Sequence, residues 1–131
     1  MILGVFKVFS DENRLRIYNL LRKKDLCVCE IEALLEINQS NLSRHLSKMK
    51  NIGVLDFYKD QQFIYYRIAD DFNEKYKNLL IELDNVLDTE EKFLEDKNNL
   101  DIYLKSGYNS DDIKLDRSGV VKHIKSCKCS S

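Results

Sequence analysis

The sequence predicts a mainly helical fold that contains one small β-hairpin. The chain of 131 residues has no proline and only four glycines, so few residues interrupt its helices. Apolar residues recur at helical spacing over residues 11–23, 26–36 and 40–51. Two short runs, 54–59 and 62–68, are rich in β-branched and aromatic residues and predict the hairpin. This length fits one compact domain with an added helix or tail.

The first predicted elements have recognisable starts. Residues 2–9 form a short apolar element. Ser10 is expected to cap the helix over 11–23, because acidic residues follow it in the first turn. Asp25 can cap the short helix over 26–36 in the same way.

The helix over 40–51 combines a narrow apolar stripe with a broad polar face. Leu42, Leu46 and Met49 form the stripe, and Gly53 ends the helix as a C′ glycine would. An ordinary solvated helix face is the alternative for such a pattern. The order of short helix, polar break, polar helix and hairpin favours a different interpretation, a winged helix-turn-helix that binds double-stranded DNA.

In this arrangement the second helix reads base edges in the major groove, and the hairpin lies against phosphates or the minor groove. Asn and Gln can bond to adenine, and Arg can bond to guanine. The candidate DNA-contacting residues on the helix are Gln39, Ser40, Asn41, Ser43, Arg44, His45 and Lys48. Those on the hairpin are Lys59, Gln61, Gln62, Tyr65 and Arg67.

The charge distribution favours the first half of the chain as the part that faces phosphates. The whole chain has a net charge of −1. Residues 1–69 contain 11 Lys and Arg against 8 Asp and Glu, whereas residues 70–131 contain 10 against 14. This bias is mild, and it supports DNA binding only together with the motif.

The apolar residues of 71–95 recur at spacings of three and four and predict one long amphipathic helix. Because a small domain cannot easily bury so long a stripe, we expect a partner helix. Residues 1–95 are therefore expected to form a DNA-binding and dimerisation domain. Residues 96–131 are expected to form a C-terminal extension, of which 113–131 is a tail with little pattern.

Composition excludes several classes of protein. No apolar run approaches the roughly 20 residues that span a bilayer, and residues 1–9 lack the features of a signal peptide. We therefore expect a cytoplasmic protein with no membrane partner, whose cysteines are reduced thiols. The sequence contains no phosphate-binding glycine loop and no plausible nucleophile–base pair, so we do not expect an enzyme.

Two Cys-x-Cys pairs are candidate metal ligands: Cys27 with Cys29, and Cys127 with Cys129. Residues i and i+2 of a regular helix point about 200° apart, so the first pair cannot chelate one ion within an unbroken helix. Binding would have to open the first turn. The helix N-terminus and the basic run 22–24 should favour thiolates, which select soft metals. The alternatives are small buried core residues for the first pair and a reduced tail without a role for the second.

Several segments between Phe6 and Ile68 together carry a family resemblance. They are Ser10-Asp11 with Arg14-Leu15-Arg16-Ile17, Leu26-Cys27-Val28-Cys29-Glu30-Ile31, Gln39-Ser40-Asn41-Leu42-Ser43-Arg44-His45-Leu46, Gly53-Val54-Leu55 and Tyr65-Tyr66-Arg67-Ile68. In this combination the chain resembles the ArsR/SmtB metalloregulators, homodimeric repressors that leave DNA when a metal or metalloid binds. The resemblance implies a homodimer through the N-terminal helix and the helix over 71–95.

The Cys-Val-Cys triplet is similar to the thiolate site of the arsenic- and antimony-sensing branch. The resemblance implies As(III) or Sb(III) as the inducer, with Cys27 and Cys29 as ligands and no catalytic cofactor. The best-known arsenic pattern has a third cysteine where this chain has Glu32. We therefore expect Cys127 or Cys129, from the same or the other subunit, to supply the third sulfur.

Other functions stay open. Cadmium and lead sensors use a similar triplet, but the additional N-terminal cysteines of the cadmium branch have no counterpart before Cys27. Residues 71–95 contain no histidine for the site of the zinc branch. The same fold could sense oxidants or reactive sulfur through disulfide formation. A thiol metal carrier, in contrast, would not bind DNA sequence-specifically.

Overall fold

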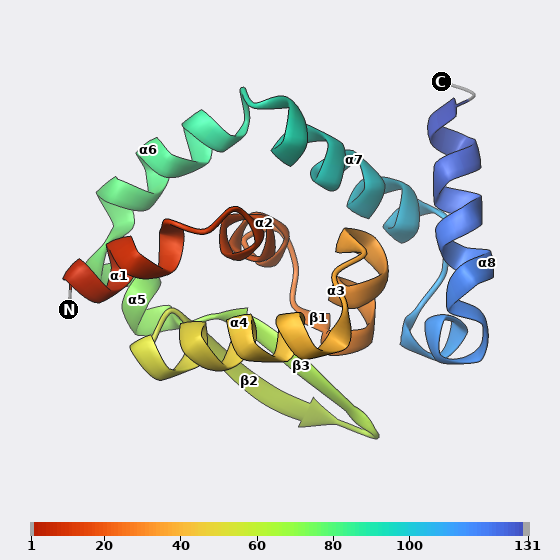
Figure 1. Ribbon diagram of the computed structural model, residues 1–131, viewed down its shortest axis with the longest axis horizontal. Helices are drawn as coiled ribbons and strands as arrows, with labels where there is room; N and C mark the ends of the chain where they lie inside the picture. The colour runs from red at the N-terminus through yellow and green to blue at the C-terminus, as the bar shows by residue number, and fades with distance from the viewer. Residues whose placement is uncertain (1, 130–131) are drawn as a thin grey trace.

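The computed structural model describes residues 2–129, with side chains described up to residue 127. In Figure 1, α2 lies at the centre, α4 and the hairpin run below it, α6 and α7 arch above it, and α8 stands at one side. The elements in order are α1 (Ile2–Phe9), α2 (Glu12–Leu21), β1 (Leu26–Cys27), α3 (Val28–Leu35), α4 (Gln39–Ile52), β2 (Leu55–Asp60), β3 (Phe63–Ile68), α5 (Asp70–Lys75), α6 (Lys77–Leu87), α7 (Glu91–Lys105) and α8 (Ser110–Cys129).

The helix-turn-helix is formed by α3 and α4. Asn38 caps α4, since its side chain accepts a hydrogen bond from the Asn41 backbone N–H at 2.9 Å. Gly53 ends the helix with φ of 92°, a left-handed conformation that glycine adopts without strain. The apolar stripe of α4 is buried, as its spacing predicts. The predicted mainly helical fold with a winged helix-turn-helix is confirmed.

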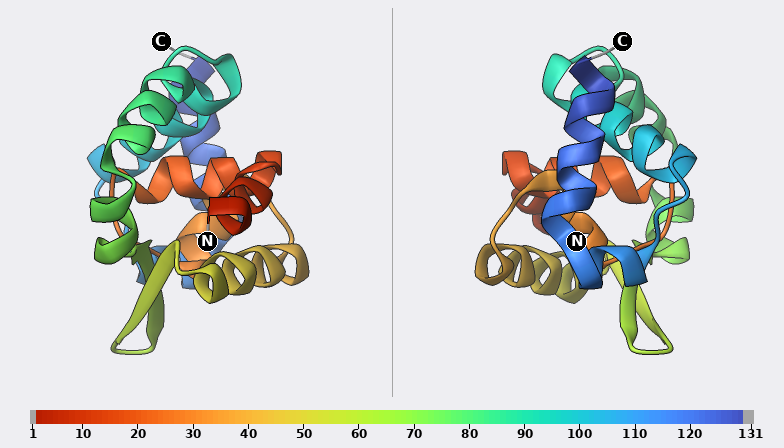
Figure 2. Two further views of the ribbon diagram at one scale, coloured as in Figure 1. Left: turned by 90° about the vertical axis from the view of Figure 1, so that its left-hand side faces the viewer. Right: turned by 90° about the vertical axis from the view of Figure 1, so that its right-hand side faces the viewer.

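The hairpin is confirmed, and a third strand joins it. The sheet has the order β1-β3-β2 with antiparallel pairing throughout. Its turn lies at Gln61 and Gln62, one residue later than predicted, with Gln61 at φ of 56°. The prediction of helix for residues 26–27 is wrong: Leu26 and Cys27 pair with β3 instead. Figure 2 shows the hairpin projecting beyond α4 as a wing.

The cap of α2 differs from the prediction by one residue. Asp11, not Ser10, is the N-cap, and its carboxylate accepts the Arg14 backbone N–H at 3.1 Å. The Ser10 hydroxyl instead donates to the Lys7 carbonyl at 2.7 Å and closes the end of α1. Both polar side chains are used locally, so the sequence alone could not separate their roles.

The prediction of one long helix over 71–95 is wrong. The chain breaks at Tyr76, with φ of −109° and ψ of 25°, and again between α6 and α7. After the second break, α7 turns back against α2 and α3 and buries Phe93, Leu100 and Tyr103 (Figure 1). Burial of these side chains outweighs the small advantage of an unbroken helix. The boundary expected after residue 95 falls inside α7.

The tail expected over 113–131 is also wrong for the described part of the chain, because α8 extends through Cys129. Its axis bends at Asp116, where the backbone is not helical. Ile113, Val120 and Ile124 are buried where α8 packs against α3 and α7. No helix of the described residues is long and apolar enough to cross a membrane.

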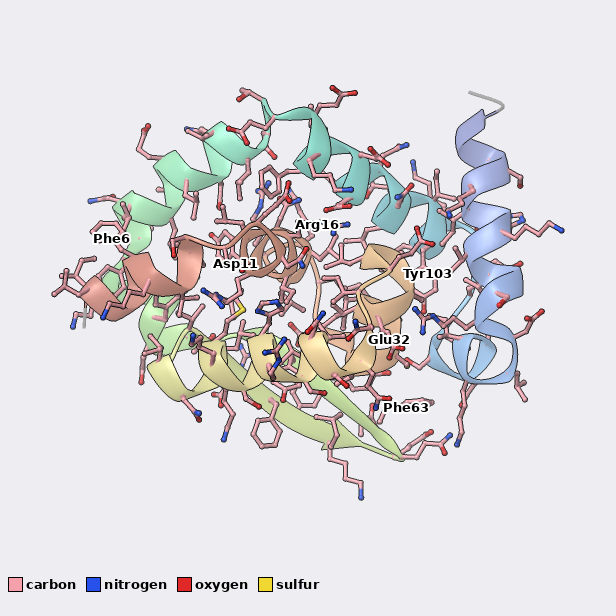
Figure 3. The ribbon with its side chains drawn as sticks, viewed as in Figure 1. Phe6, Asp11, Arg16, Glu32, Phe63 and Tyr103 are labelled. Atoms are coloured by element: carbon pink, nitrogen blue, oxygen red, sulfur yellow. The ribbon has the colours of Figure 1, made fainter. Side chains whose placement is uncertain are left out.

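A buried ion pair joins the helices around the core. The Arg16 guanidinium of α2 donates to both carboxylate oxygens of Asp96 in α7, at 2.8 and 3.1 Å. It also donates to the Leu35 carbonyl at the end of α3, at 3.2 Å. The two side chains are only 11% and 2% exposed. Arg16 therefore connects α2, α3 and α7 (Figure 3).

Replacing Asp96 by alanine should lower the free energy of unfolding by about 3 kcal/mol, because the Arg16 charge then stays buried without its partner. Urea unfolding followed by circular dichroism measures the change. Arg67→Ala is the matched control, since the pair of Arg67 with Asp70 is 37% and 82% exposed. That control should change stability by less than about 0.5 kcal/mol. Equal losses in the two variants would contradict the prediction.

Candidate functional site

Cys27 and Cys29 lie at the junction of β1 and α3. Cys27 is the N-cap of α3, with extended dihedral angles of −79° and 163°, and Cys29 lies in the first helical turn. The two thiols interact, and this interaction lowers the pKa of Cys27. The premise that both cysteines lie in one unbroken helix is wrong, because Cys27 belongs to β1. Because Cys27 lies outside the helix, the 200° separation does not apply.

A buried carboxylate holds this junction in place. Glu30 Oε1 accepts the Cys27 backbone N–H at 2.9 Å, and the Glu30 N–H points back toward the Cys27 sulfur, which makes a capping box. Glu30 Oε2 accepts the Tyr103 hydroxyl of α7. Burial is the main cause that raises the pKa of Tyr103, and the hydrogen bond to Glu30 raises it further. The hydroxyl therefore stays protonated and continues to donate.

The first residue of α8 completes the surroundings of the pair. The Cys27 Sγ lies 3.3 Å from the Ser110 hydroxyl, and the Tyr65 hydroxyl of β3 lies 3.0 Å from the same oxygen. Cys27 and Ser110 are both buried, whereas Cys29 is half-buried. Ser110 therefore connects the thiols to a strand of the wing.

The two thiols differ in acidity. The hydrogen bond from Cys29 lowers the pKa of Cys27, and the same interaction, with burial, raises the pKa of Cys29. The pair therefore loses its first proton readily and holds the second strongly. The basic run before β1 contributes less than expected: Arg22 donates to Asp88 at 2.6 Å, and Lys23 lies beside Asp88 and Lys97.

The structure does not bring Cys127 to the first thiol pair. Arg117 of α8 binds Glu32 of α3, and Lys125 binds Glu36 at 3.1 Å, so the two helices run in the same direction. Figure 3 shows Glu32 on the side of α3 that faces α8. Cys127 therefore lies beyond the end of α3, at least roughly 13 Å along the helix from its start. It contacts His123 Nε2 at 3.4 Å.

Cys129, the other predicted ligand of the tail, has its side chain outside the described residues. Among the side chains that are described, no group of three or more His, Cys, Asp or Glu could hold a metal ion. The site at β1 and α3 thus offers two sulfur donors from this chain. Two adjacent thiols can together bind one soft metal or metalloid.

The predicted DNA-contacting residues of α4 form one polar face. Gln39, Ser40, Ser43, Arg44 and Lys48 are exposed, whereas Asn41 and His45 are half-buried. The Arg44 guanidinium donates to the Asn41 side chain, and His45 contacts Arg14.

Of the five predicted DNA-contacting residues of the wing, two are exposed at its tip and three contact other parts of the protein. Lys59 and Gln61 are exposed near the tip of the hairpin. Gln62 instead binds Asp111 and Lys114 of α8. Tyr65 faces Ser110 beside the thiols, and Arg67 pairs with Asp70 at 2.7 Å.

Glu30, Ser110 and Tyr103 are site residues that sequence reasoning missed. Glu30 had a signal, because it stands three residues after Cys27 as the acidic residue of a capping box does. Ser110 follows the Asn109 cap of α8, whose side chain accepts the Asp112 backbone N–H at 3.1 Å. No local pattern predicts that α8 reaches Cys27 or that Tyr103 reaches Glu30.

The sequence is similar to those of known bacterial regulatory proteins. Residues 11–56 match the sequence profile of the bacterial regulatory proteins of the arsR family. The cadmium resistance regulatory protein CadC of Listeria innocua is 41% identical over 78 residues, which are 59% of this chain and 63% of that protein. The arsenic resistance regulator ArsR1 of Pseudomonas putida is 40% identical over 65 residues, which are 49% of this chain and 51% of that protein. The chain thus spans less than two thirds of these relatives.

Other relatives are matched over most of their length. An uncharacterized HTH-type transcriptional regulator of Methanocaldococcus jannaschii is 35% identical over 80 residues, 60% of this chain and 90% of that protein. The crystal structure of the regulator HlyU from Vibrio vulnificus has a TM-score of 0.53 and 30% identity, covering 63% of this chain and 85% of that chain.

A homodimeric winged helix-turn-helix domain from Mycobacterium bovis, a possible ArsR-family regulator, shares the fold with a TM-score of 0.56 and 24% identity. The structural match covers 69% of this chain and 84% of that domain. With the profile match, the matched relatives and the helix-turn-helix in agreement, the chain belongs to the arsR family of transcriptional regulators.

Proposed function

We propose that this protein is a homodimeric DNA-binding repressor of the cytoplasm, released from its operator when trivalent arsenic or antimony binds Cys27 and Cys29. The observation that carries the proposal is the position of the two cysteines, since Cys27 is the N-cap of α3 and Cys29 lies in its first turn. This helix is followed directly along the chain by α4, which presents the polar face. The thiol site and the DNA-reading helix are therefore parts of one small unit.

The polar face of α4 and the wing support DNA binding. Exposed amide, hydroxyl and basic side chains at the N-terminal half of α4 can donate to base edges in the major groove. Lys59 and Gln61 project with the wing tip, where they can contact phosphates. Gln62, Tyr65 and Arg67 have protein partners in this structure and would contribute only after those contacts change.

Exposed apolar side chains on α1 and α6 support a dimer. Leu3 and Phe6 of α1 are 71% and 55% exposed, and Ile81 and Val86 of α6 are 48% and 50% exposed. Figure 1 shows these two helices at the same end of the molecule, away from α8. An apolar surface of this kind favours association. Homodimerisation of the M. bovis domain is consistent with this proposal.

Ligand binding at the thiols would act on contacts that reach the wing. Each sulfur replaces a hydroxyl group on As(OH)₃, and the thiol proton leaves with that hydroxyl as water. The Cys29 proton is then no longer donated to Cys27, and the Cys27 proton no longer faces Ser110. Because Ser110 also binds Tyr65 of β3, this change can shift α8 and the wing together.

Cys127 of α8 lies away from the site, and the dimer surface proposed on α1 and α6 also lies away from α8, so a third sulfur from Cys127 or Cys129 of either copy would require α8 to move. A Cd²⁺ sensor is the second candidate, and the 41% identity to CadC favours it as strongly as the 40% identity to ArsR1 favours arsenic. Reversible thiol oxidation is the third.

A gel shift with the DNA upstream of the gene tests the main proposal. Wild-type protein should bind this duplex specifically under reducing conditions, and arsenite should release it. Cys27→Ser/Cys29→Ser should bind DNA but should need at least about tenfold more arsenite for release, since its soft ligands are lost. Parallel titrations with Cd²⁺ and peroxide separate the alternatives. Absence of specific binding by the wild type would refute the repressor and leave a metal carrier.

The third ligand is tested separately. Cys127→Ser/Cys129→Ser should weaken arsenite binding by about tenfold or more, because a trivalent ion then has only two sulfur ligands. Isothermal titration calorimetry measures the affinity. Ser126→Ala is a control within the same segment. Unchanged affinity in the double variant would exclude the tail as a source of the third sulfur.

Acidity of the pair provides a further prediction. Cys29→Ala removes the donor that lowers the pKa of Cys27, so the Cys27 thiolate should form at higher pH than in the wild type. Thiolate absorbance near 240 nm, followed against pH in a Cys127→Ser/Cys129→Ser background, measures the shift. A downward shift would show that Cys29 does not stabilise the Cys27 thiolate.

A further inference from the structure

The guanidinium of Arg14 lies between the end of α1 and the reading helix α4. Its Nε donates to the Val8 carbonyl at 2.6 Å, and Nη2 donates to the Lys7 carbonyl at 3.1 Å. Its Nη1 lies 3.4 Å from Nδ1 of His45, on α4. Arg14 itself is fixed at the start of α2, where its backbone N–H bonds to Asp11.

The chemistry of arginine determines the form of the histidine. A guanidinium has only N–H donors and remains charged in proteins. Nδ1 of His45 must therefore be the acceptor in this contact, and the imidazole proton must reside on Nε2. Nε2 lies on the ring edge away from Arg14.

We propose that Arg14 is a positioning residue that holds His45 as a neutral Nε2–H donor for an acceptor on DNA. This inference rests on the proposed DNA-binding function and assigns Arg14, outside the helix-turn-helix, a part in it. The acceptor would be a guanine O6 or N7 atom or a phosphate oxygen.

The charged groups around His45 agree with a neutral ring. Partial burial lowers the pKa of His45, and the cations Arg14, Arg44 and Lys48 lower it further, whereas Asp11 raises it. The net direction is downward. The neutral form of His45 is therefore favoured at neutral pH, and it should act through a directed hydrogen bond.

The same guanidinium also fixes the end of α1. Its two carbonyl contacts close the last turn of this helix, where free carbonyls need donors. Arg14 could thus affect DNA binding in two ways: through His45, or through the position of α1 at the proposed dimer surface. The experiment must distinguish these two routes.

Nitrogen NMR of the free protein tests the histidine without DNA. In the wild type, His45 should show the Nε2-protonated tautomer and titrate below the ordinary histidine range. In Arg14→Met, the pKa of His45 should rise, because one cation is lost while Asp11 remains. His123, on α8, serves as the internal control and should not change. An Nδ1-protonated His45, or a pKa unchanged in Arg14→Met, would overturn the proposal.

A double-mutant cycle tests the effect on DNA. With the duplex upstream of the gene at pH 7.5, Arg14→Met and His45→Leu should each weaken binding about tenfold, and the double variant little more than either. If the double variant instead loses about 100-fold in DNA affinity, the two single effects multiply and are independent. Arg14 would then act only through its contacts with α1, and the proposal would be overturned. His45→Gln should keep most of the affinity, because its amide can accept from Arg14 and donate to DNA.

A pH series separates positioning from general damage to the fold. Wild-type affinity should be nearly constant from pH 6.5 to 8, whereas the Arg14→Met variant should bind more tightly as the pH falls, since His45 then gains a proton and a charge. Parallel pH profiles would contradict the proposal. If the wild type binds no duplex specifically, the DNA-binding function fails, and the NMR result still decides the form of His45.

Discussion

The buried carboxylate of Glu30 is the constraint on which the candidate site depends. One of its oxygens accepts the Cys27 N–H, and the other accepts the Tyr103 hydroxyl, so Glu30 fixes the start of α3 and ties it to α7. A buried carboxylate without these donors would be costly, which makes the junction sensitive to disturbance. Because Cys27 is thereby held in an extended conformation, its sulfur can meet that of Cys29. The geometry of the thiols thus follows from a capping interaction.

Cys27 and Cys29 differ in their exposure to solvent, and this difference affects how a ligand could bind them. Cys27 is fully buried and Ser110 nearly so, whereas Cys29 is half-buried. An incoming metalloid would therefore reach Cys29 first and Cys27 only after Ser110 moves. Arg117 and Lys125 attach α8 to α3 only beyond the bend at Asp116, so a movement at Ser110 would act first on the short helical segment before the bend. Binding chemistry at two small side chains can in this way become a displacement of that segment.

The helix-turn-helix, the hairpin and the polar face could be predicted from the sequence, because each rests on local signals. These signals are the polar break before α4, the glycine after it and the change of apolar spacing. Long-range packing was not predictable in the same way. Residues 71–95 have a continuous helical pattern, yet Phe93 is drawn into the core and breaks the run. In α8 the buried residues Ile113, Val120 and Ile124 stand among mostly polar neighbours, so no pattern predicted that this helix packs on the domain. The contact of Ser110 with Cys27 follows only from that packing.

The helix α4 packs on α1, α2 and β2 and so belongs to a rigid unit. Arg14 connects it to the end of α1. In α3, the helix that precedes it, Glu30 and Arg117 form connections to α7 and α8. The buried pair of Arg16 and Asp96 lies between these connections and opposes their separation. Since such packed units move as bodies more readily than they deform, a change at the thiols should alter the orientation of α4 and leave its structure intact.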